Sequence, residues 1–226
     1  MIRELFLLTT AARKTKPFIE GVGAVAAAPR RFRDCTIGLL TGSTGCSATE
    51  ICRQATTQAD WPFPTIPPEP DEKTVLLAWL EKLIGFIPSL YGSADSMRRQ
   101  VLRQLGQRGA PPTFFDGANR LARKTNLIDS LCYIGDESGA PIIFVGGPDI
   151  RATLTTPSRI ALLEAVRGRL TLQCELPAPI LSDAKLIAAE ACQIELAADL
   201  VEIFLRAKGP QFAHSMPRSS VPSGSR

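Results

Sequence analysis

The residues IIFVGG at positions 142–147 constrain the fold of this chain most strongly. They are apolar, three of the six are β-branched, none is charged, and the run ends in two glycines. A run without polar alternation is typical of a strand buried on both faces, which occurs in parallel sheets covered by helices on both sides. The run therefore predicts a parallel sheet. The length of 226 residues suits one domain, or one domain with a small appendage.

Three further short runs are strand candidates, and helical periodicity fills the segments between them. The candidates are TIGLLT at 36–41, TFFD at 113–116 and LTLQCEL at 170–176. Helices are expected at 2–28 (one or two helices), 48–57, 73–87, from Gly92-Ser93 onward, at 127–134, at 159–169 and at 183–206. Strands that alternate with helices predict an α/β sheet with crossover helices.

Two segments should not form regular structure. Five prolines stand between residues 60 and 72, and they exclude a helix and a central strand. We expect an exposed, extended connection there. The last residues, 217–226, are Ser, Pro, Gly and Arg with little else, and this composition predicts disorder.

Composition argues against several classes of function. The six cysteines form no C-x-x-C, and there is one histidine, so neither a zinc site nor a histidine-dependent nucleophile is expected. We expect reduced thiols and a cytoplasmic protein. No apolar stretch reaches the ~18 residues of a membrane helix, and the N-terminus does not read as a signal peptide. Neither the net charge of +4 nor the aromatic content of 6% indicates nucleic-acid binding.

A glycine-rich loop follows the strand candidate at 36–41 and precedes a helix. This is the layout of a phosphate-binding loop, G-x-x-x-x-G-K-[ST]. The aligned residues are Gly42, Ser43, Thr44, Gly45, Cys46, Ser47, Ala48 and Thr49. Gly42, Gly45 and Thr49 fit the pattern, whereas Ser47 replaces a glycine and Ala48 replaces the lysine that contacts the β- and γ-phosphates. The alternative interpretation is a plain glycine-rich turn.

The strand candidate at 113–116 ends in Asp116. In phosphate-loop enzymes an acidic residue at this place orients magnesium, and a following glutamate activates the attacking water. Here Gly117 stands in place of the glutamate. Taken alone, Asp116 fits a surface aspartate in an Asp-Gly turn better than it fits a magnesium-orienting acid.

Four segments together resemble one family. They are TIGLLTGSTGCSAT, FFDGANRL, LIDSLCYIGDESGAPIIFVGGPDIRATL and RGRLTLQCELPAPILSDAKLIAAE. In this order they resemble AAA+ ATPases of transposition, the target-selection ATPases similar to the bacteriophage Mu B protein, with degenerate Walker A and Walker B motifs. The resemblance covers roughly 36–206. It implies a P-loop NTPase αβα sandwich with a parallel sheet and a short C-terminal helical lid.

The resemblance also implies a domain organisation and roles for single residues. An N-terminal helical segment (1–35) would precede the core (36–176), a truncated lid (177–208) and a disordered tail (209–226). The phosphate-loop residues would hold ATP or ADP weakly, with Thr49 and Asp116 on magnesium. Gly146 or Gly147 falls where the family has a polar sensor. Arg169 resembles the arginine that reaches the nucleotide of a neighbouring subunit, although a solvated helix-end arginine is equally compatible.

The lysine, the glutamate and the polar sensor are replaced together, so we expect little or no ATP hydrolysis and assign no catalytic residue. The resemblance implies a homo-oligomeric scaffold on double-stranded DNA or a transposase, without a membrane partner. Two alternatives stay open: an active ATPase in which Arg53 or Arg33 serves the phosphates, and a decayed mobile-element remnant. A cluster of arginines could serve DNA or form a solvated face: Arg98, Arg99, Arg103 and Arg108.

Overall fold

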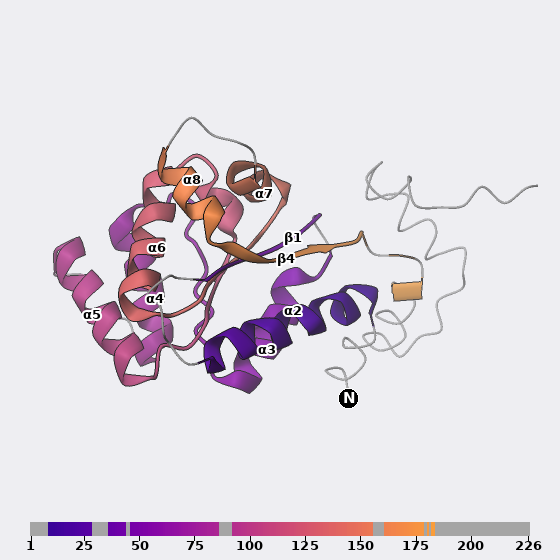
Figure 1. The fold of residues 1–226 in the computed structure, drawn as a ribbon, viewed down its shortest axis with the longest axis horizontal. Coiled ribbons are helices and arrows are strands. Elements are labelled where there is room, and N and C mark those ends of the chain that lie inside the picture. Colours follow the sequence, from indigo (N-terminus) through magenta and orange to yellow (C-terminus); the bar gives the residue numbers. More distant parts are fainter. Residues whose placement is uncertain are drawn as a thin grey trace, which may run out of the picture.

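A four-stranded parallel sheet forms the centre of the molecule (Figure 1). The computed structural model describes residues 9–28, 36–43, 46–85, 92–155, 161–178, 180 and 182–183. The strands are β1 (Ile37–Gly42), β2 (Thr113–Asp116), β3 (Ile142–Gly146) and β4 (Leu170–Leu176). Their spatial order is β2-β3-β1-β4. The four strand candidates and the parallel arrangement are confirmed.

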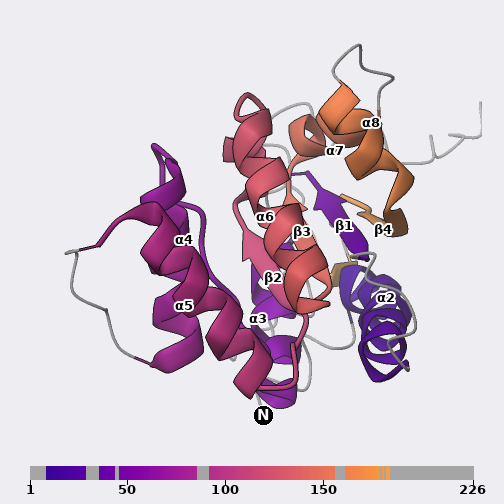
Figure 2. The same cartoon turned by 60° about the vertical axis from the view of Figure 1, so that its left-hand side comes forward.

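Helices cover both faces of this sheet (Figures 1 and 2). They are α2 (Thr10–Ala27), α3 (Ala48–Ala59), α4 (Glu72–Ile84), α5 (Ala94–Gln107), α6 (Thr125–Ser138), α7 (Pro148–Thr155) and α8 (Ala161–Gly168), with a short 3-10 helix η1 (Ala118–Leu121). Figure 1 shows α2 and α3 on one side of the sheet and α7 and α8 on the other. The result is the expected three-layer αβα sandwich.

Alternating side chains of each strand divide the core into two clusters. Phe115 and Phe144 belong to the cluster that contains α4 to α8, whereas Phe114, Ile143 and Val145 pack towards α2 and α3. All five are at most 1% exposed. Because both faces of these strands are covered, both sets of alternating positions must be apolar. This requirement produces the uninterrupted apolar runs in the sequence.

The proline-rich segment that precedes α4 is extended, as expected, but it is not an exposed connection. It runs along the free edge of β2, where the carbonyls of Pro62 and Pro64 accept hydrogen bonds from the amides of Phe114 (3.0 Å) and Asp116 (2.9 Å). The amide of Ile66 returns a bond to the carbonyl of Asp116 (2.9 Å). Proline can accept but not donate in such a ladder, so the segment forms an irregular edge strand. Pro62, Pro64 and Ile66 are buried, which corrects the expected exposure.

Other elements differ from expectation in extent. Helix α6 is longer than the segment 127–134, because polar residues at both of its ends obscure the apolar stripe. Helix α7, which begins at Pro148, was not predicted. The expected segment 2–28 contains a helix, α2, that begins after Thr9 and covers β4 with buried Phe18 and Val22. Nearly all of the expected lid helix, and the tail, lie outside the described residues.

Candidate nucleotide-binding site

The C-terminal ends of the parallel strands bring the two predicted motifs together. Strand β1 ends at Gly42 and β2 ends at Asp116, at the same edge of the sheet. The Oγ1 of Thr49, at the start of α3, donates a hydrogen bond of 2.9 Å to Oδ1 of Asp116. This contact joins residues that are 67 positions apart. A hydroxyl and a carboxylate at this spacing are the oxygen ligands that a magnesium ion would take in a phosphate-loop site.

The loop after β1 closes tightly over Gly42. The amide of Cys46 donates to the carbonyl of Ser43 (3.1 Å), and the Cys46 side chain is only 4% exposed. A Cβ at Gly42 would collide with the Sγ of Cys46 and would lie 3.1 Å from the Cβ of Leu176. Only glycine therefore fits at the first position of the loop. The site residues Thr44 and Gly45 lie outside the described residues.

The two residues that depart from the loop pattern sit at the start of α3. Ser47, the N-cap residue, has φ 62° and ψ 19°, and its side chain caps no amide. This is the left-handed region that glycine adopts at little cost and other residues adopt with strain. Ala48 opens the helix and packs partly against the core beneath it. A positive charge from the lysine position is therefore absent, although the turn retains the conformation that favours glycine.

The backbone is distinct at Gly117, where the family resemblance implies a glutamate. Gly117 has φ 71° and ψ 27°, and it leads directly into η1. A glutamate at this position would carry its Cβ in a left-handed conformation, at a cost of ~1–2 kcal/mol. The backbone at Gly117 has the conformation of a glycine turn. A Gly117→Glu substitution alone would therefore not provide a well-placed general base, because the backbone would also have to change.

The end of β3 is equally tight. A Cβ on Gly146 would lie 2.9 Å from the backbone nitrogen of Asn119 and 3.3 Å from Cγ2 of Ile150, whereas one on Gly147 would meet nothing within 4 Å. A polar sensor therefore has no room at Gly146, because backbone and a packed isoleucine occupy the space. Gly147 is the position that could carry a larger residue.

Arg169 lies at the other edge of the sheet, just before β4. Its guanidinium forms an ion pair with Asp136 of α6 (2.5 Å), and its carbonyl accepts from the amide of Ile37 (3.0 Å). Ile37 is the first residue of β1, so Arg169 is separated from Gly42 by the length of that strand. The fold does not bring Arg169 to the phosphate loop of its own chain.

A cavity of about 440 Å³ opens beside the candidate phosphate loop. Gly42 and Ser43 form one side, the end of β4 contributes Glu175, and the first half of α7 contributes Arg151. Lys14 of α2 completes the lining. Arg151 is ion-paired with Glu175 across this opening. Sequence reasoning missed Lys14, Arg151 and Glu175, because no local pattern links three segments so distant along the chain.

The buried thiols near the loop are uncharged at neutral pH. Burial raises the pKa of Cys46, of Cys174 and, most strongly, of Cys52, where the negative charge of Asp116 adds to the effect. A thiol with a raised pKa is a poor nucleophile and a poor metal ligand. Within the described part of the chain, no group of three or more His, Cys, Asp or Glu could hold a metal ion.

The parallel sheet, the glycine-rich loop after β1 and the helices on both faces define the fold as a three-layer αβα sandwich. No protein-family model matches the sequence, and no curated protein matches it. Solved structures do match in fold. The ORC1 protein of Aeropyrum pernix in complex with DNA superposes with a TM-score of 0.59 at 12% identity, covering 82% of this chain and 50% of that one.

Two further structures show the same likeness. The ORC2 protein of Aeropyrum pernix, in ADPNP and ADP complexes, gives a TM-score of 0.58 at 13% identity over 89% of this chain and 58% of that one. Drosophila ORC bound to DNA gives 0.54 at 12% identity over 88% and 50%. The chain thus spans about half the length of these proteins. At such identities the likeness establishes the fold.

Within the described residues, no helix has the length and apolar character needed to cross a bilayer.

Proposed function

We propose that the protein is a AAA+ scaffold that binds ATP or ADP weakly and hydrolyses it little or not at all. The hydrogen bond between Thr49 and Asp116 carries this proposal. It preserves the pair that would hold magnesium, whereas Ala48 and Gly117 occupy the positions of the lysine and the glutamate. Loss of one preorganised charged contact costs ~10²–10³ in rate, so losing both leaves turnover near background.

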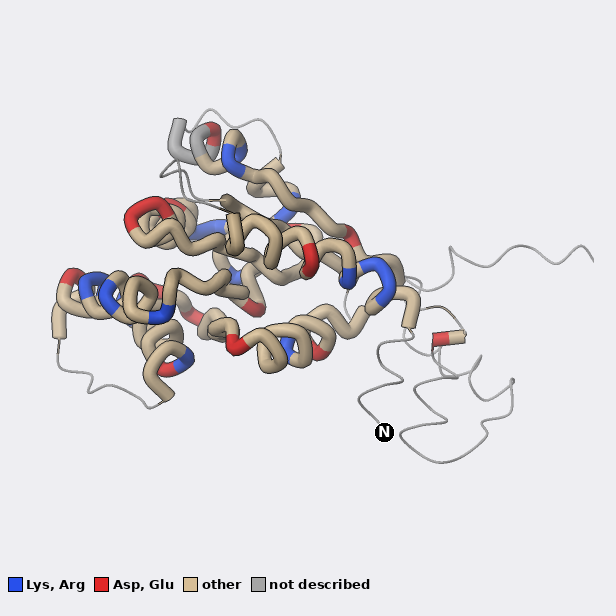
Figure 3. Tube along the Cα trace, turned by 60° about the horizontal axis from the view of Figure 1, so that its bottom comes forward, with Lys and Arg blue, Asp and Glu red and all other residues tan. Residues whose placement is uncertain are grey.

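The scaffold would act in oligomers on double-stranded DNA or on a transposase. Two solved structures of the same fold, the ORC1 protein and Drosophila ORC, are bound to DNA, which supports this partner. Two of the four clustered arginines support it less: Arg98 of α5 pairs with Glu72 and Asp95, and Arg108, the C-cap of α5, pairs with Asp60. Figure 3 shows basic and acidic residues interspersed over the helices rather than gathered on one face.

Arg169 is the proposed contact to a neighbouring subunit. A planar guanidinium binds phosphate well, but in this chain Asp136 already engages it. Assembly would have to exchange that carboxylate for the phosphates of the neighbour. Light scattering with and without ADP, on the wild type and on Arg169→Ala, tests this step. A wild type that stays monomeric at tens of micromolar, with or without DNA, excludes the assembly proposal.

An active ATPase is the second candidate, and the contacts of Arg53 weigh against one form of it. Arg53 pairs with Glu50 on the exposed side of α3, so it is not directed to the loop. Arg33 lies outside the described residues.

Nucleotide titration separates these candidates. We expect calorimetry to give a weak, magnesium-dependent affinity for ADP in the wild type. Thr49→Val, which keeps the side-chain shape, should remove the magnesium dependence, whereas Thr57→Val on the exposed side of α3 should leave it unchanged. Robust magnesium-dependent phosphate release by the wild type would refute the proposal in favour of an ATPase. Complete absence of ADP binding would refute both.

A further inference from the structure

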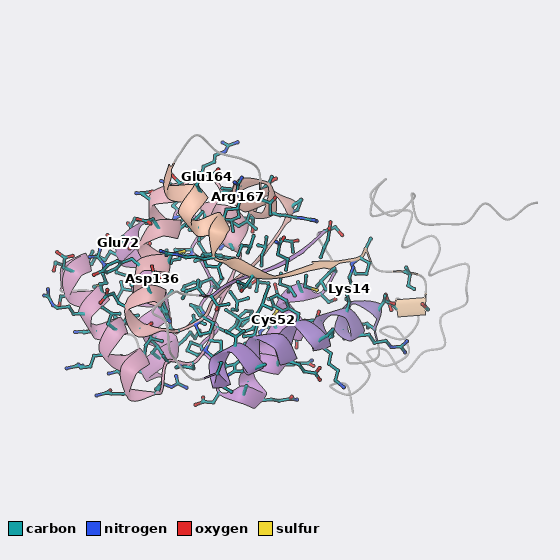
Figure 4. All side chains as sticks on the ribbon, viewed as in Figure 1. Lys14, Cys52, Glu72, Asp136, Glu164 and Arg167 are labelled. Atoms are coloured by element: carbon teal, nitrogen blue, oxygen red, sulfur yellow. The ribbon has the colours of Figure 1, made fainter. Side chains whose placement is uncertain are left out.

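The cavity beside the phosphate loop has the size and the lining of a small-molecule site. Its volume of about 440 Å³ falls within the range of ~300–1,000 Å³ that is usual for ligand pockets. It lies between the end of β1, the end of β4 and the start of α7, with α2 along one side. Lys14 of α2 is labelled in Figure 4. We infer that this cavity holds the phosphates of a nucleoside di- or triphosphate, and that Lys14 supplies the positive charge that Ala48 lacks.

The charge balance of the cavity supports an anionic ligand. Arg151 and Glu175 neutralise each other, so Lys14 is left as the net charge of the lining. Among the described residues Lys14 has no ion-pair partner, and the residues one turn away on α2 are uncharged. Its neighbour Lys16, in contrast, lies 3.9 Å from the carboxylate of Glu20. An unneutralised ammonium beside a glycine-rich loop is the condition under which phosphate binds.

A second feature of the lining would bond to such an anion. The Oγ of Ser43 is buried and has no hydrogen-bond partner among the described residues. Leaving a buried hydroxyl unpaired costs ~1–3 kcal/mol, and a phosphate oxygen would accept its proton. Ser43 adjoins Gly42, whose missing side chain allows the close turn. The hydroxyl and the lysine thus border the same cavity from β1 and from α2.

The backbone of Lys14 is held in place from two sides. The carbonyl of Lys14 accepts a hydrogen bond from Sγ of Cys174 in β4 (3.6 Å). At the start of α2, Oδ1 of Asp183 accepts from the amide of Thr10 (2.9 Å) and from its hydroxyl (3.1 Å). The residues after β4 therefore fasten the N-terminal end of α2 beside the loop. A cation on a fixed backbone loses less freedom when it binds a ligand.

This inference rests on the proposed function and specifies which side of the loop takes the phosphates. The missing lysine would come from the first turn of α3. Lys14 comes from α2, which contacts β4 on the other side of β1 from β3 and β2. The two positions would serve the same anion from different directions, so a lysine restored at Ala48 should make Lys14 less important.

Calorimetric titration with ADP and magnesium tests the inference. Lys14→Ala should weaken ADP affinity about tenfold, the worth of one charged hydrogen bond. Lys16→Ala is the matched control on the same helix and should change it less than about twofold. Both side chains are exposed, so both variants should fold, which thermal unfolding checks. Equal affinity of Lys14→Ala and the wild type would overturn the inference and leave the proposed function intact.

Two further variants test the direction of the effect. Glu175→Gln removes the negative charge of the lining and should tighten ADP binding about two- to fivefold; weaker binding would place the phosphates elsewhere. In an Ala48→Lys background, Lys14→Ala should reduce ADP affinity much less than it does in the wild type. An equal reduction in both backgrounds would refute the inference that Lys14 replaces the phosphate-loop lysine. Inorganic tripolyphosphate should show the same Lys14 dependence, because the inference concerns the phosphates. A wild type that binds neither probe refutes the inference together with the proposed function.

Discussion

The serine at the start of α3 allows a quantitative test of backbone strain in the candidate phosphate loop. Ser47 is held at φ 62°, ψ 19° and makes no side-chain cap. A non-glycine residue in this region costs ~1–2 kcal/mol, and glycine costs ~0.5–1 kcal/mol more backbone entropy on folding. We therefore expect Ser47→Gly to stabilise the protein by about 0.5–1 kcal/mol. For a chain of this size, that raises Tm by ~1–4 °C.

The matched control is the same substitution at another helix start. Ser93, the N-cap of α5, has φ −75°, and its hydroxyl accepts from the amide of Ser96 (3.2 Å). Ser93→Gly loses that hydrogen bond and relieves no backbone strain, so it should destabilise the protein by a few tenths to about 1 kcal/mol. Urea unfolding followed by circular dichroism compares the two. If both substitutions destabilise equally, the strain assigned to Ser47 is wrong.

Three further predictions follow from the site and its surroundings. Gly42→Ala should lower the free energy of unfolding by ~1–3 kcal/mol. Adding Cys46→Ala should recover part of that loss in urea unfolding, because it removes the colliding sulfur; a double variant whose loss equals the sum of the two single losses would contradict this. Gly117→Glu should lower Tm and, on its own, restore no phosphate release in a steady-state assay, whereas substantial turnover would show that only the glutamate was missing. The hydrogen bond from Arg98 holds the pKa of Glu72 below its ordinary value of 4.5, so this pair stabilises the fold above that pH and loses its effect as pH falls through the lowered value. Acid titration of unfolding should show a shallower loss below pH 4.5 for Glu72→Gln, and identical acid limbs would refute the contribution.

The strands could be predicted from the sequence because parallel strands covered on both faces require continuous apolar runs. The candidates at 113–116 and 170–176 match β2 and β4 in full. The loop and the acid could be placed at one sheet edge for a related reason: parallel strands end together. Strand direction places Thr49 and Asp116 at the same end of the sheet. Their contact also requires α3 to pack across β3, because β3 lies between β1 and β2.

The rest of the site depends on packing that no local pattern records. Lys14 reaches the cavity because α2 lies across β4, and that arrangement is set by buried contacts such as those of Phe18. Nothing in the residues around Lys14 indicates its distance from Gly42. The prediction that the proline-rich segment is exposed was wrong for a different reason. Prolines indicate an exposed connection, but at the edge of β2 the positions of Pro62 and Pro64 need only carbonyl acceptors, so both prolines can be buried there.

The replaced positions are fitted to their surroundings, and this bears on the choice between a scaffold and a decayed remnant. A Cβ on Gly146 would strike the backbone of Asn119, and the turn at Gly117 has a positive φ. Cys46 fills the space that Gly42 leaves open. Substitutions that accumulate without selection fall independently of their neighbours and leave clashes or voids in a core packed at crystal density. Mutual fit at three places in one site favours the proposed scaffold, with a loop that serves binding or assembly, over the alternative of a decayed remnant.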